Sequence, residues 1–295
     1  MTKLTVFTPV YNREKLIKRL YDSLLKQRFK DFEWLIIDDG STDKTAEVIK
    51  NIIQEKKLDI KYYYKKNGGK HTAYNLGIEK AIGELFVIVD SDDIVLENGF
   101  SEIIKKWDSL ENRNKLLGIS GIDLTSDFEV IGGKYPEDCF LCSHLEMREI
   151  YKVKGDKTEI FRTNLLKGIF FPIFENEKFL TEAILFEPLY KKYRTYFINI
   201  PLIIRDYQKN GLSDNSLKLR TGNPIGAMEY YKQNIRLCVT KRKRIKSKIN
   251  YYRFSQHAKI KFNIKEKINF YYLIGSFIYL IDKYKLNKWS YQKNE

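Results

Sequence analysis

Three carboxylates follow a short apolar segment near residue 90. The run Asp90-Ser91-Asp92-Asp93 comes directly after the apolar residues 85–89. Carboxylates this close repel one another unless a cation neutralises them, and their oxygens are the ligands that Mg²⁺ and Mn²⁺ prefer. A magnesium-type site needs only one or two protein carboxylates, because water and substrate phosphates complete it. The run therefore predicts metal and phosphate binding at Asp92 and Asp93, with an acidic turn before a helix as the alternative.

A second segment suited to anions is Asn67-Gly68-Gly69-Lys70, which precedes an expected helix. Glycines let backbone N–H groups approach an anion, and the first turn of a helix favours negative charge. Lys70 adds a full positive charge. The spacing is not that of a Walker A motif, and no G-x-G-x-x-G follows the first expected strand, which argues against a dinucleotide fold. We predict a phosphate contact at Lys70, with an ordinary exposed loop as the alternative.

The elements that must position these residues alternate between two periodicities. Short apolar strands that alternate with helices predict a parallel sheet covered on both faces. Ligands of such sheets bind beyond the carboxyl ends of the strands. The polar segments after three strands, at 8–12, 38–40 and 90–93, should therefore meet at one edge. The expected strands are residues 4–8, 34–37, 60–64 and 85–89, and the expected helices are residues 14–27, 41–54 and 71–82.

The rest of the chain is less regular up to residue 215 and is then helical. Beyond residue 216 there is almost no Gly or Pro, which indicates long helices. We predict an α/β fold, with a mostly parallel sheet flanked by helices and a basic helical C-terminal extension. In the middle of the chain, the expected strands are residues 116–122, 128–131 and 196–205, and the expected helix is residues 182–192.

The positive charge of the protein is concentrated at its C-terminal end. The net charge is +15, and residues 216–295 contain 19 Lys and Arg but only 4 Asp and Glu. The preceding residues are neutral overall, so the C-terminal region is expected to meet something anionic. The chain has 3 Cys, which does not suit a disulfide-rich secreted protein. No signal-peptide pattern opens the sequence, and we expect a cytoplasmic location.

Several segments, in order, resemble glycosyltransferase family 2. The resemblance is nearly continuous over residues 2–100 and looser over 100–215. It implies the nucleotide-diphospho-sugar transferase fold, called GT-A. The segments that carry it are Thr8-Pro9-Val10-Tyr11-Asn12, Gln27 with Phe29, Glu33 through Asp43, Asn67-Gly68-Gly69-Lys70, Ala73-Tyr74-Asn75-Leu76-Gly77, Gly83-Glu84 and Asp90-Ser91-Asp92-Asp93.

The resemblance implies a domain division and an activity. A glycosyltransferase domain would occupy 1–215, with a nucleotide-binding half at 1–100 and an acceptor-binding half at 101–215. A basic, aromatic-rich helical region would occupy 216–295. The activity implied is metal-dependent, inverting transfer of a hexosyl or N-acetylhexosaminyl group from a nucleotide-diphosphate sugar, most naturally a UDP-sugar. Because the basic C-terminal region suggests a substrate near a membrane, the acceptor expected is a glycan or a lipid-linked sugar in cell-envelope or surface polysaccharide synthesis.

The same resemblance implies roles for the donor-binding residues. Thr8, Pro9 and Tyr11 would line the nucleobase pocket, with the Tyr11 ring stacked on the base. Asp39 would accept a hydrogen bond from N3–H of uracil.

For the rest of the donor, Asp92 would contact the ribose and share in metal binding. Asp93 would hold the Mn²⁺ or Mg²⁺ that bridges the two phosphates, and Lys70 would face the pyrophosphate. A divalent metal and a lysine stabilise the charge that develops on the leaving phosphate.

A catalytic base is expected in the second half, because an acceptor hydroxyl needs a carboxylate within hydrogen-bond reach. Glu182 is our candidate, with Glu175, Glu177 and Glu187 as nearby rivals. A helix-capping or solvent-facing role is the alternative for Glu182. The segment 207–213 also resembles one that closes the site in related enzymes.

Two other function classes are the alternatives to sugar transfer. A nucleotidyltransferase would need a glycine-rich, arginine-containing loop after the first strand, where this chain has Thr8 to Asn12. A non-catalytic membrane or nucleic-acid binder would not need Asp39, Asp92 and Asp93 to be intact. The Gln-x-x-Arg-Trp signature of processive synthases is absent, so we expect single, non-processive additions.

The C-terminal region contains a basic run at 241–248 and an apolar, aromatic segment at 270–281. The apolar segment is shorter than the roughly 20 residues that span a bilayer. An interfacial helix fits better, so residues 240–285 are expected to bind an anionic membrane, at the inner face of the cell membrane. Packing on the catalytic body or on a second copy is the alternative. No recognition motif supports nucleic-acid binding.

Cys139 and Cys142 have the spacing of metal ligands, and His144 lies close by. A zinc site needs four ligands, and no second pair of this kind is present. We therefore interpret these cysteines as structural thiols.

Overall fold

The computed structural model describes residues 2–206, 216–263 and 267–291, the last five by their backbone alone. The chain forms two compact units. The first contains Met1–Phe171 and Pro188–Gln208, and the second contains Pro172–Glu187 and Lys209–Glu295. The domain boundary expected at residue 215 stays a prediction.

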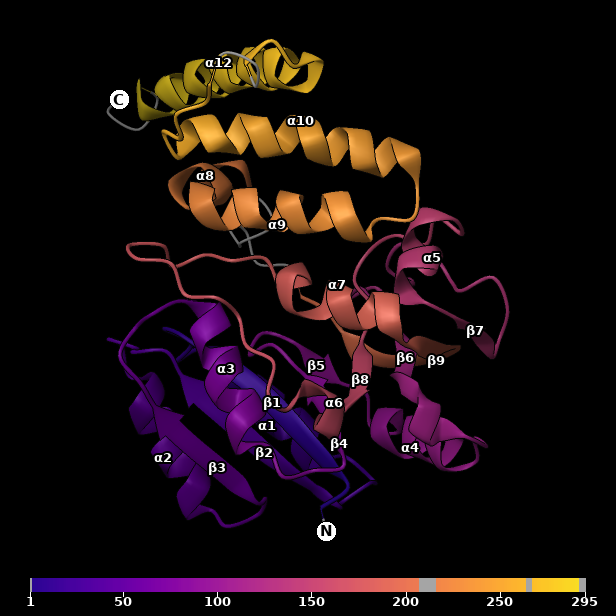
Figure 1. Ribbon diagram of the computed structural model, residues 1–295. Coiled ribbons are helices and arrows are strands. Elements are labelled where there is room, and N and C mark those ends of the chain that lie inside the picture. The colour runs from indigo at the N-terminus through magenta and orange to yellow at the C-terminus, as the bar shows by residue number, and fades with distance from the viewer. Residues whose placement is uncertain (1, 207–215, 264–266, 292–295) are drawn as a thin grey trace. The chain divides into compact units, whose positions relative to one another are not determined.

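Four parallel strands form one half of the sheet in the first unit (Figure 1). They are β1 (Leu4–Val10), β2 (Phe32–Asp38), β3 (Ile60–Tyr64) and β4 (Leu85–Ile88), in the spatial order β3-β2-β1-β4. Every residue of β1 and β2 is buried, as a parallel sheet covered on both faces requires. The predicted α/β fold with strands that alternate with helices is therefore confirmed.

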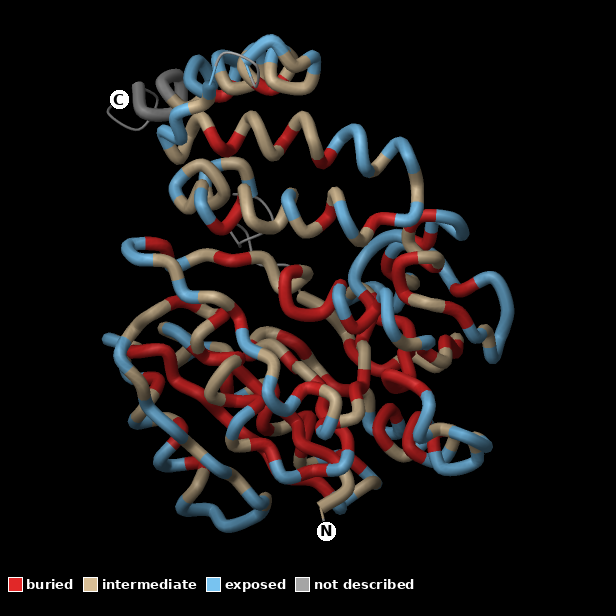
Figure 2. The backbone as a smooth tube through the Cα atoms, in the orientation of Figure 1, coloured by how far each residue is buried: buried red, intermediate tan, exposed pale blue. Residues whose placement is uncertain are grey.

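Helices cover both faces of these strands. Three helices share one core with Leu4, Val6 and Trp34, and Figure 2 shows the buried backbone that runs through this core. They are α1 (Ile17–Leu25), α2 (Thr45–Gln54) and α4 (Gly99–Asp108). On the other face lies α3 (Lys70–Lys80), whose Tyr74 ring packs edge-on against Phe7 at 5.2 Å between ring centroids.

The other half of the sheet is mixed. Strand β8 (Glu159–Arg162) runs antiparallel to β4 and to β6 (Leu116–Leu124), and β6 runs parallel to β9 (Arg194–Ile204). Two short strands, β5 (Ile94–Val95) and β7 (Phe140–Cys142), pair antiparallel with β9. The short helices of this half are η1 (Arg113–Lys115), α5 (His144–Glu149) and α6 (Thr163–Leu166).

The strand expected at residues 128–131 is wrong. Only Val130 pairs there, in an isolated bridge with Leu124. The chain instead turns back, with Phe128 N–H bonded to Thr125 O at 2.9 Å and Phe128 at a φ of 61°. A turn this tight leaves too few residues in extended conformation to form a ladder.

The second unit is helical over its described residues beyond 215. Its helices are α8 (Ser216–Gly222), α9 (Pro224–Leu237), α10 (Lys241–His257) and α12 (Phe270–Tyr291), and α7 (Ala183–Lys192) begins in this unit. Helix α10 packs against both α9 and α12. Over the parts of the chain that the structure describes, none of the helices has the length and apolar composition needed to cross a bilayer.

Candidate active site

The ends of β1 and β2 are joined by a polar side chain. The Asn12 N–H donates to Ser41 Oγ at 2.9 Å, and Asn12 Oδ1 accepts from the Thr42 N–H at 2.8 Å. Helix α2 begins only at Thr45. Its N-cap residue is Lys44, whose side chain makes no capping hydrogen bond. The helix start expected at 41 is therefore wrong, because Ser41 and Thr42 bind the neighbouring strand end instead.

The nucleobase residues predicted on β1 differ in exposure. Thr8 is completely buried, and its Oγ1 accepts a hydrogen bond from Trp34 Nε1 at 3.0 Å. Pro9 is buried as well. Tyr11 follows the strand and exposes 46% of its surface, so it is the member of this group that a ligand can reach directly.

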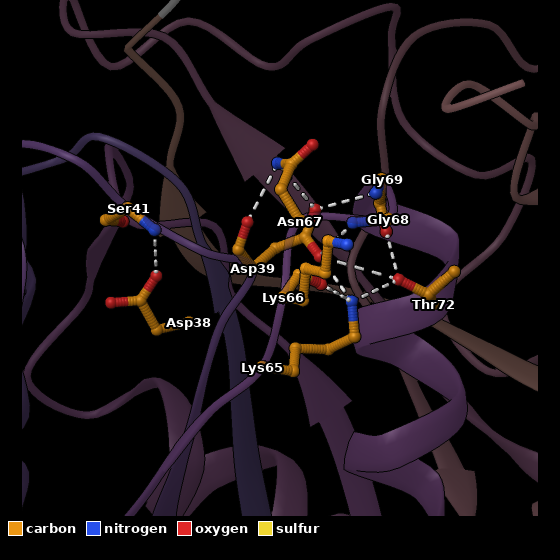
Figure 3. A network of polar contacts seen from close by, with 9 residues as sticks. All are labelled: Asp38, Asp39, Ser41, Lys65, Lys66, Asn67, Gly68, Gly69 and Thr72. Atoms are coloured by element: carbon orange, nitrogen blue, oxygen red, sulfur yellow. Dashed lines mark hydrogen bonds and ion pairs between the residues drawn. The ribbon is translucent and has the colours of Figure 1, made fainter. Parts of the chain in front are cut away.

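Asp39 organises the glycine loop (Figure 3). Its carboxylate accepts hydrogen bonds from the backbone N–H groups of Gly68 at 3.0 Å and Gly69 at 2.8 Å. It also accepts from Lys65 Nζ at 2.6 Å and from Asn67 Nδ2 at 3.2 Å. These contacts hold a loop that lies about thirty residues further along the chain.

The glycine at the end of this loop is required by its backbone conformation. Gly69 has a φ of 95°, which side chains other than hydrogen rarely allow. This conformation turns its N–H toward Asp39 and lets α3 begin at Lys70. Sequence reasoning missed Lys65 as a partner of Asp39. The available signal was its position just before the glycine-rich turn, in a chain whose second strand ends in acidic residues.

Lys70 lies beside the acidic turn that follows β4. Its Nζ is 2.9 Å from an oxygen of Asp90. Burial alone would raise the pKa of Asp90, but Lys70 and then Arg205 outweigh it and hold the pKa below its usual range. Burial and the neighbouring Asp90 raise the pKa of Asp92. The glycine loop and the acidic turn thus meet at the carboxyl edge of the sheet.

Asp93 takes part in a buried ion-pair network. Arg205 Nη1 lies 2.7 Å from Asp93 Oδ2, and Arg205 Nε lies 2.8 Å from Asp123 Oδ2. Thr158 Oγ1 donates to the other oxygen of Asp123 at 2.6 Å. Burial raises the pKa of Asp93 to about 8, although Arg205 opposes this shift.

Sequence reasoning missed Arg205 and Asp123. The signal for Asp123 was one carboxylate near the end of the apolar segment 116–124, and the signal for Arg205 was a cation at the last residue of an expected strand.

Arg19 on α1 holds the same turn from another side. Its guanidinium donates to the backbone carbonyl of Asp92 and forms a 2.7 Å ion pair with Asp206. Two arginines, one on α1 and one directly after β9, therefore hold the backbone and a side chain of the acidic turn.

The acidic turn has the chemistry of a partial metal site. Among the described residues, no cluster of three or more His, Cys, Asp and Glu side chains is arranged as a complete site. Two carboxylates are enough when substrate phosphates supply further ligands. Burial and the negative charge of Asp90 both raise the pKa values of Asp92 and Asp93, because they disfavour the ionised carboxylates. A bound divalent cation would stabilise these carboxylates in their ionised form.

The comparisons with known proteins agree with this geometry. The family model described as glycosyl transferase family 2 matches residues 5–162, more than half of the chain. The chain belongs to this family.

Curated relatives of this family 2 chain include bacterial glycosyltransferases. An uncharacterised glycosyltransferase of Rickettsia conorii is 35% identical over 171 residues, which cover 58% of this chain and 23% of that protein. The chain thus spans about a quarter of that relative's length. The GalNAc(5)-diNAcBac-PP-undecaprenol beta-1,3-glucosyltransferase of Campylobacter jejuni is 29% identical over 233 residues, which cover 75% of this chain and 72% of that protein.

Solved structures share the fold of this family 2 chain. Staphylococcus aureus TarS, residues 1–349 in complex with UDP-GlcNAc, matches with a TM-score of 0.64 at 20% identity. The match covers 92% of this chain and 79% of that one. The predicted GT-A-type arrangement, a central sheet flanked by helices, is therefore confirmed.

The candidate base of this family 2 chain, Glu182, belongs to the second unit, immediately before α7. The structure separates its rivals by their contacts. Glu177 accepts hydrogen bonds from the Ile225 and Gly226 N–H groups, both at 2.7 Å, at the start of α9. Glu187 is buried and lies 3.4 Å from Lys243 Nζ. Glu182 is half-buried and Glu175 is exposed, and the assignment of the base to Glu182 stays a prediction.

Two further predictions concern other parts of this family 2 chain. The segment 207–213, expected to close the site, lies outside the described residues. Cys139 is exposed and Cys142 is buried, and both are free thiols.

Proposed function

We propose that this family 2 protein transfers a sugar from a nucleotide-diphosphate donor, a UDP-sugar, to a glycan or lipid-linked acceptor of the cell envelope. The observation that carries the proposal is the meeting of the Asp39-bound glycine loop with the turn at Asp90–Asp93. A loop held in shape by Asp39, a lysine and paired carboxylates lie there at one sheet edge, where ligands of parallel sheets bind.

In this proposal the nucleobase stacks on the exposed ring of Tyr11, while buried Thr8 and Pro9 set the position of that ring. The N3–H of uracil reaches Asp39 by replacing one of its side-chain donors, Lys65, Asn67 or Thr72. The two glycine N–H groups stay bound, so the loop keeps its shape. The name of the TarS structure includes UDP-GlcNAc, which supports a uridine donor for this chain.

The diphosphate lies against Lys70 and the acidic turn. Asp93 and Asp92 would hold Mn²⁺ or Mg²⁺, with Asp92 also in contact with the ribose. Bound there, such a cation supplies charge stabilisation for the departing nucleoside diphosphate. Lys70 contributes a second positive charge. In the structure its Nζ forms an ion pair with Asp90 Oδ1 at 2.9 Å.

Glu182 serves as the base. A carboxylate that accepts the proton of an acceptor hydroxyl makes the oxygen nucleophilic. Attack on the anomeric carbon from the face opposite the leaving phosphate forms one glycosidic bond, breaks one C–O bond and inverts the anomeric configuration. The name of the Campylobacter relative contains an undecaprenol diphosphate acceptor, which supports a lipid-linked acceptor here. We propose one addition per encounter.

The test combines donor binding with turnover. Calorimetric titration should show UDP binding that is stronger with Mn²⁺ than with EDTA, and stronger than GDP binding. UDP-glucose and UDP-GlcNAc, offered with undecaprenol-diphosphate-linked sugars, should then release UDP.

Glu182→Gln should bind UDP normally but lose turnover by about 100-fold or more, and Glu175→Gln is the matched control that should keep it. If UDP did not bind, the proposal that the donor is a UDP-sugar would be wrong. Normal turnover of Glu182→Gln would remove only the assignment of the base.

A further inference from the structure

Helix α12 carries a continuous apolar stripe. Five large side chains follow one another at intervals of three, four, three and four residues, which places them on one face of a helix. Each exposes between 58% and 72% of its surface. This face, called the α12 stripe, consists of Phe270, Leu273, Phe277, Leu280 and Tyr284.

The opposite face of α12 packs against α10 through both polar and aromatic side chains. Asp282 forms ion pairs with Arg253 at 2.6 Å and with His257 at 3.1 Å. Ser276 Oγ accepts a hydrogen bond from Gln256 Nε2 at 2.6 Å. The rings of Tyr272 and Tyr279 pack there too, with centroids 5.7 Å from Tyr252 and 4.7 Å from His257. The α12 stripe therefore stays exposed although the other face of the helix is already packed. Contiguous exposed apolar surface of this kind marks an interaction site.

We propose that the α12 stripe inserts into the surface of an anionic phospholipid bilayer. Charge complementarity selects this partner, because residues 216–295 contain 19 Lys and Arg and only 4 Asp and Glu. Lys283 and Lys285 are exposed on α12 itself, where lysines beside an apolar face can reach lipid phosphates. Each cation near an anionic leaflet strengthens attachment.

The same charge argues against a second copy of the chain as the occupant. The spacing of the stripe would also suit a helix–helix seam. A second copy, however, would bring an equally cationic region against the first, and like charges at close range oppose association. A bilayer that contains anionic lipids removes this repulsion and covers the apolar side chains. This inference is independent of the proposed sugar transfer, because it concerns binding alone.

The test measures binding of the full chain to vesicles by co-sedimentation. Vesicles of phosphatidylglycerol and phosphatidylcholine should bind the protein, whereas vesicles of pure phosphatidylcholine should bind it about tenfold less. Phe277→Ser and Leu273→Ser should each weaken binding to the anionic vesicles by about tenfold. Because both side chains face away from α10, the helical circular dichroism should not change.

Phe128→Ser is the matched control. Phe128 exposes 67% of its surface in the first unit, so this variant removes a comparable apolar group and should bind vesicles as the parent does. Three results would overturn the proposal. One is no binding to anionic vesicles, and another is equal binding by the Phe277→Ser and Phe128→Ser variants. The third is a parent protein that is dimeric by light scattering and becomes monomeric in Phe277→Ser.

Discussion

Asp93 and Arg205 form a buried ion pair, with 2.7 Å between Oδ2 and Nη1, although 112 residues separate them in the chain. The guanidinium also neutralises Asp123, whose side chain is completely buried. One cation therefore balances two buried carboxylates, and the acidic turn depends on it.

Replacing Arg205 should be costly. Arg205→Gln leaves two buried carboxylates without their cation, and we expect the free energy of unfolding to fall by roughly 3 kcal/mol. Urea unfolding followed by tryptophan fluorescence measures this, since Trp34 and Trp107 are buried in the first unit. Arg28→Gln is the control, because Arg28 and Glu97 form an exposed pair that is worth less than about 1 kcal/mol. Equal losses in both variants would contradict the role given to Arg205.

Asp39→Asn should disturb donor binding through the glycine loop. The amide keeps one acceptor oxygen but turns an NH₂ group toward a donor such as the Gly69 N–H. We expect UDP to bind about tenfold more weakly by calorimetry, as one unmade charged hydrogen bond implies. Asp22→Asn, which removes a carboxylate exposed on α1, should bind UDP as the parent does. An Asp39→Asn variant with unchanged affinity would show that the loop does not need this carboxylate.

The pairing of Asp282 predicts a pH dependence in the second unit. Burial would raise the pKa of Asp282, but hydrogen bonds from His257 and Arg253 outweigh it and lower the pKa. A lowered carboxylate pKa gives stability that is complete above the unfolded-state value and is lost as pH falls through the folded-state value.

Asp282→Asn should therefore destabilise the unit by about 2 kcal/mol at pH 7. The difference from the parent should shrink steadily below the ordinary aspartate pKa of 3.8. Thermal unfolding followed by far-ultraviolet circular dichroism at several pH values measures both effects. A difference that is the same at all pH values would exclude the ion pair as its source.

The two thiols of the Cys-x-x-Cys segment should react at different rates. Cys139 is exposed, whereas Cys142 is buried and burial raises its pKa to about 11. Since the thiolate is the nucleophile, Cys142 should stay unlabelled by a thiol reagent at pH 8 until the protein unfolds. Mass spectrometry of labelled peptides measures the two sites separately, and the exposed Cys139 is the internal control. Equal labelling of both in the folded protein would contradict the burial of Cys142.

The sequence predicted the parallel half of the sheet because its strands are continuous apolar runs that end in distinctive polar groups. The segment at 60–64 matches β3 residue for residue, and the polar ends of β1 and β2 meet as expected. The segment 128–131 failed because an apolar run that short does not reveal the turn at Phe128. The local sequence also did not show that α2 begins at Thr45. Ser41 and Thr42 look like helix-capping residues, but they bind Asn12 after β1 instead.

The candidate site was predictable where neighbouring residues carry the chemistry, and not where distant residues complete it. The acidic turn and the glycine loop are local features, so spacing reveals them. Lys65, Asp123 and Arg205 act through contacts over 26 to 112 residues. Only the sheet order brings these residues to the same edge as Asp39 and Asp93.

The bridge from Arg205 to Asp93 also limits how the chain can be divided or recombined. A fragment that ends at residue 100 keeps Asp93 but loses the only arginine bonded to its carboxylate among the contacts described. The smallest fragment that keeps this pair must therefore extend past β9 to Arg205. In a chimaera of two related enzymes, Asp123 and Arg205 would have to come from the same parent, because they form one ion pair.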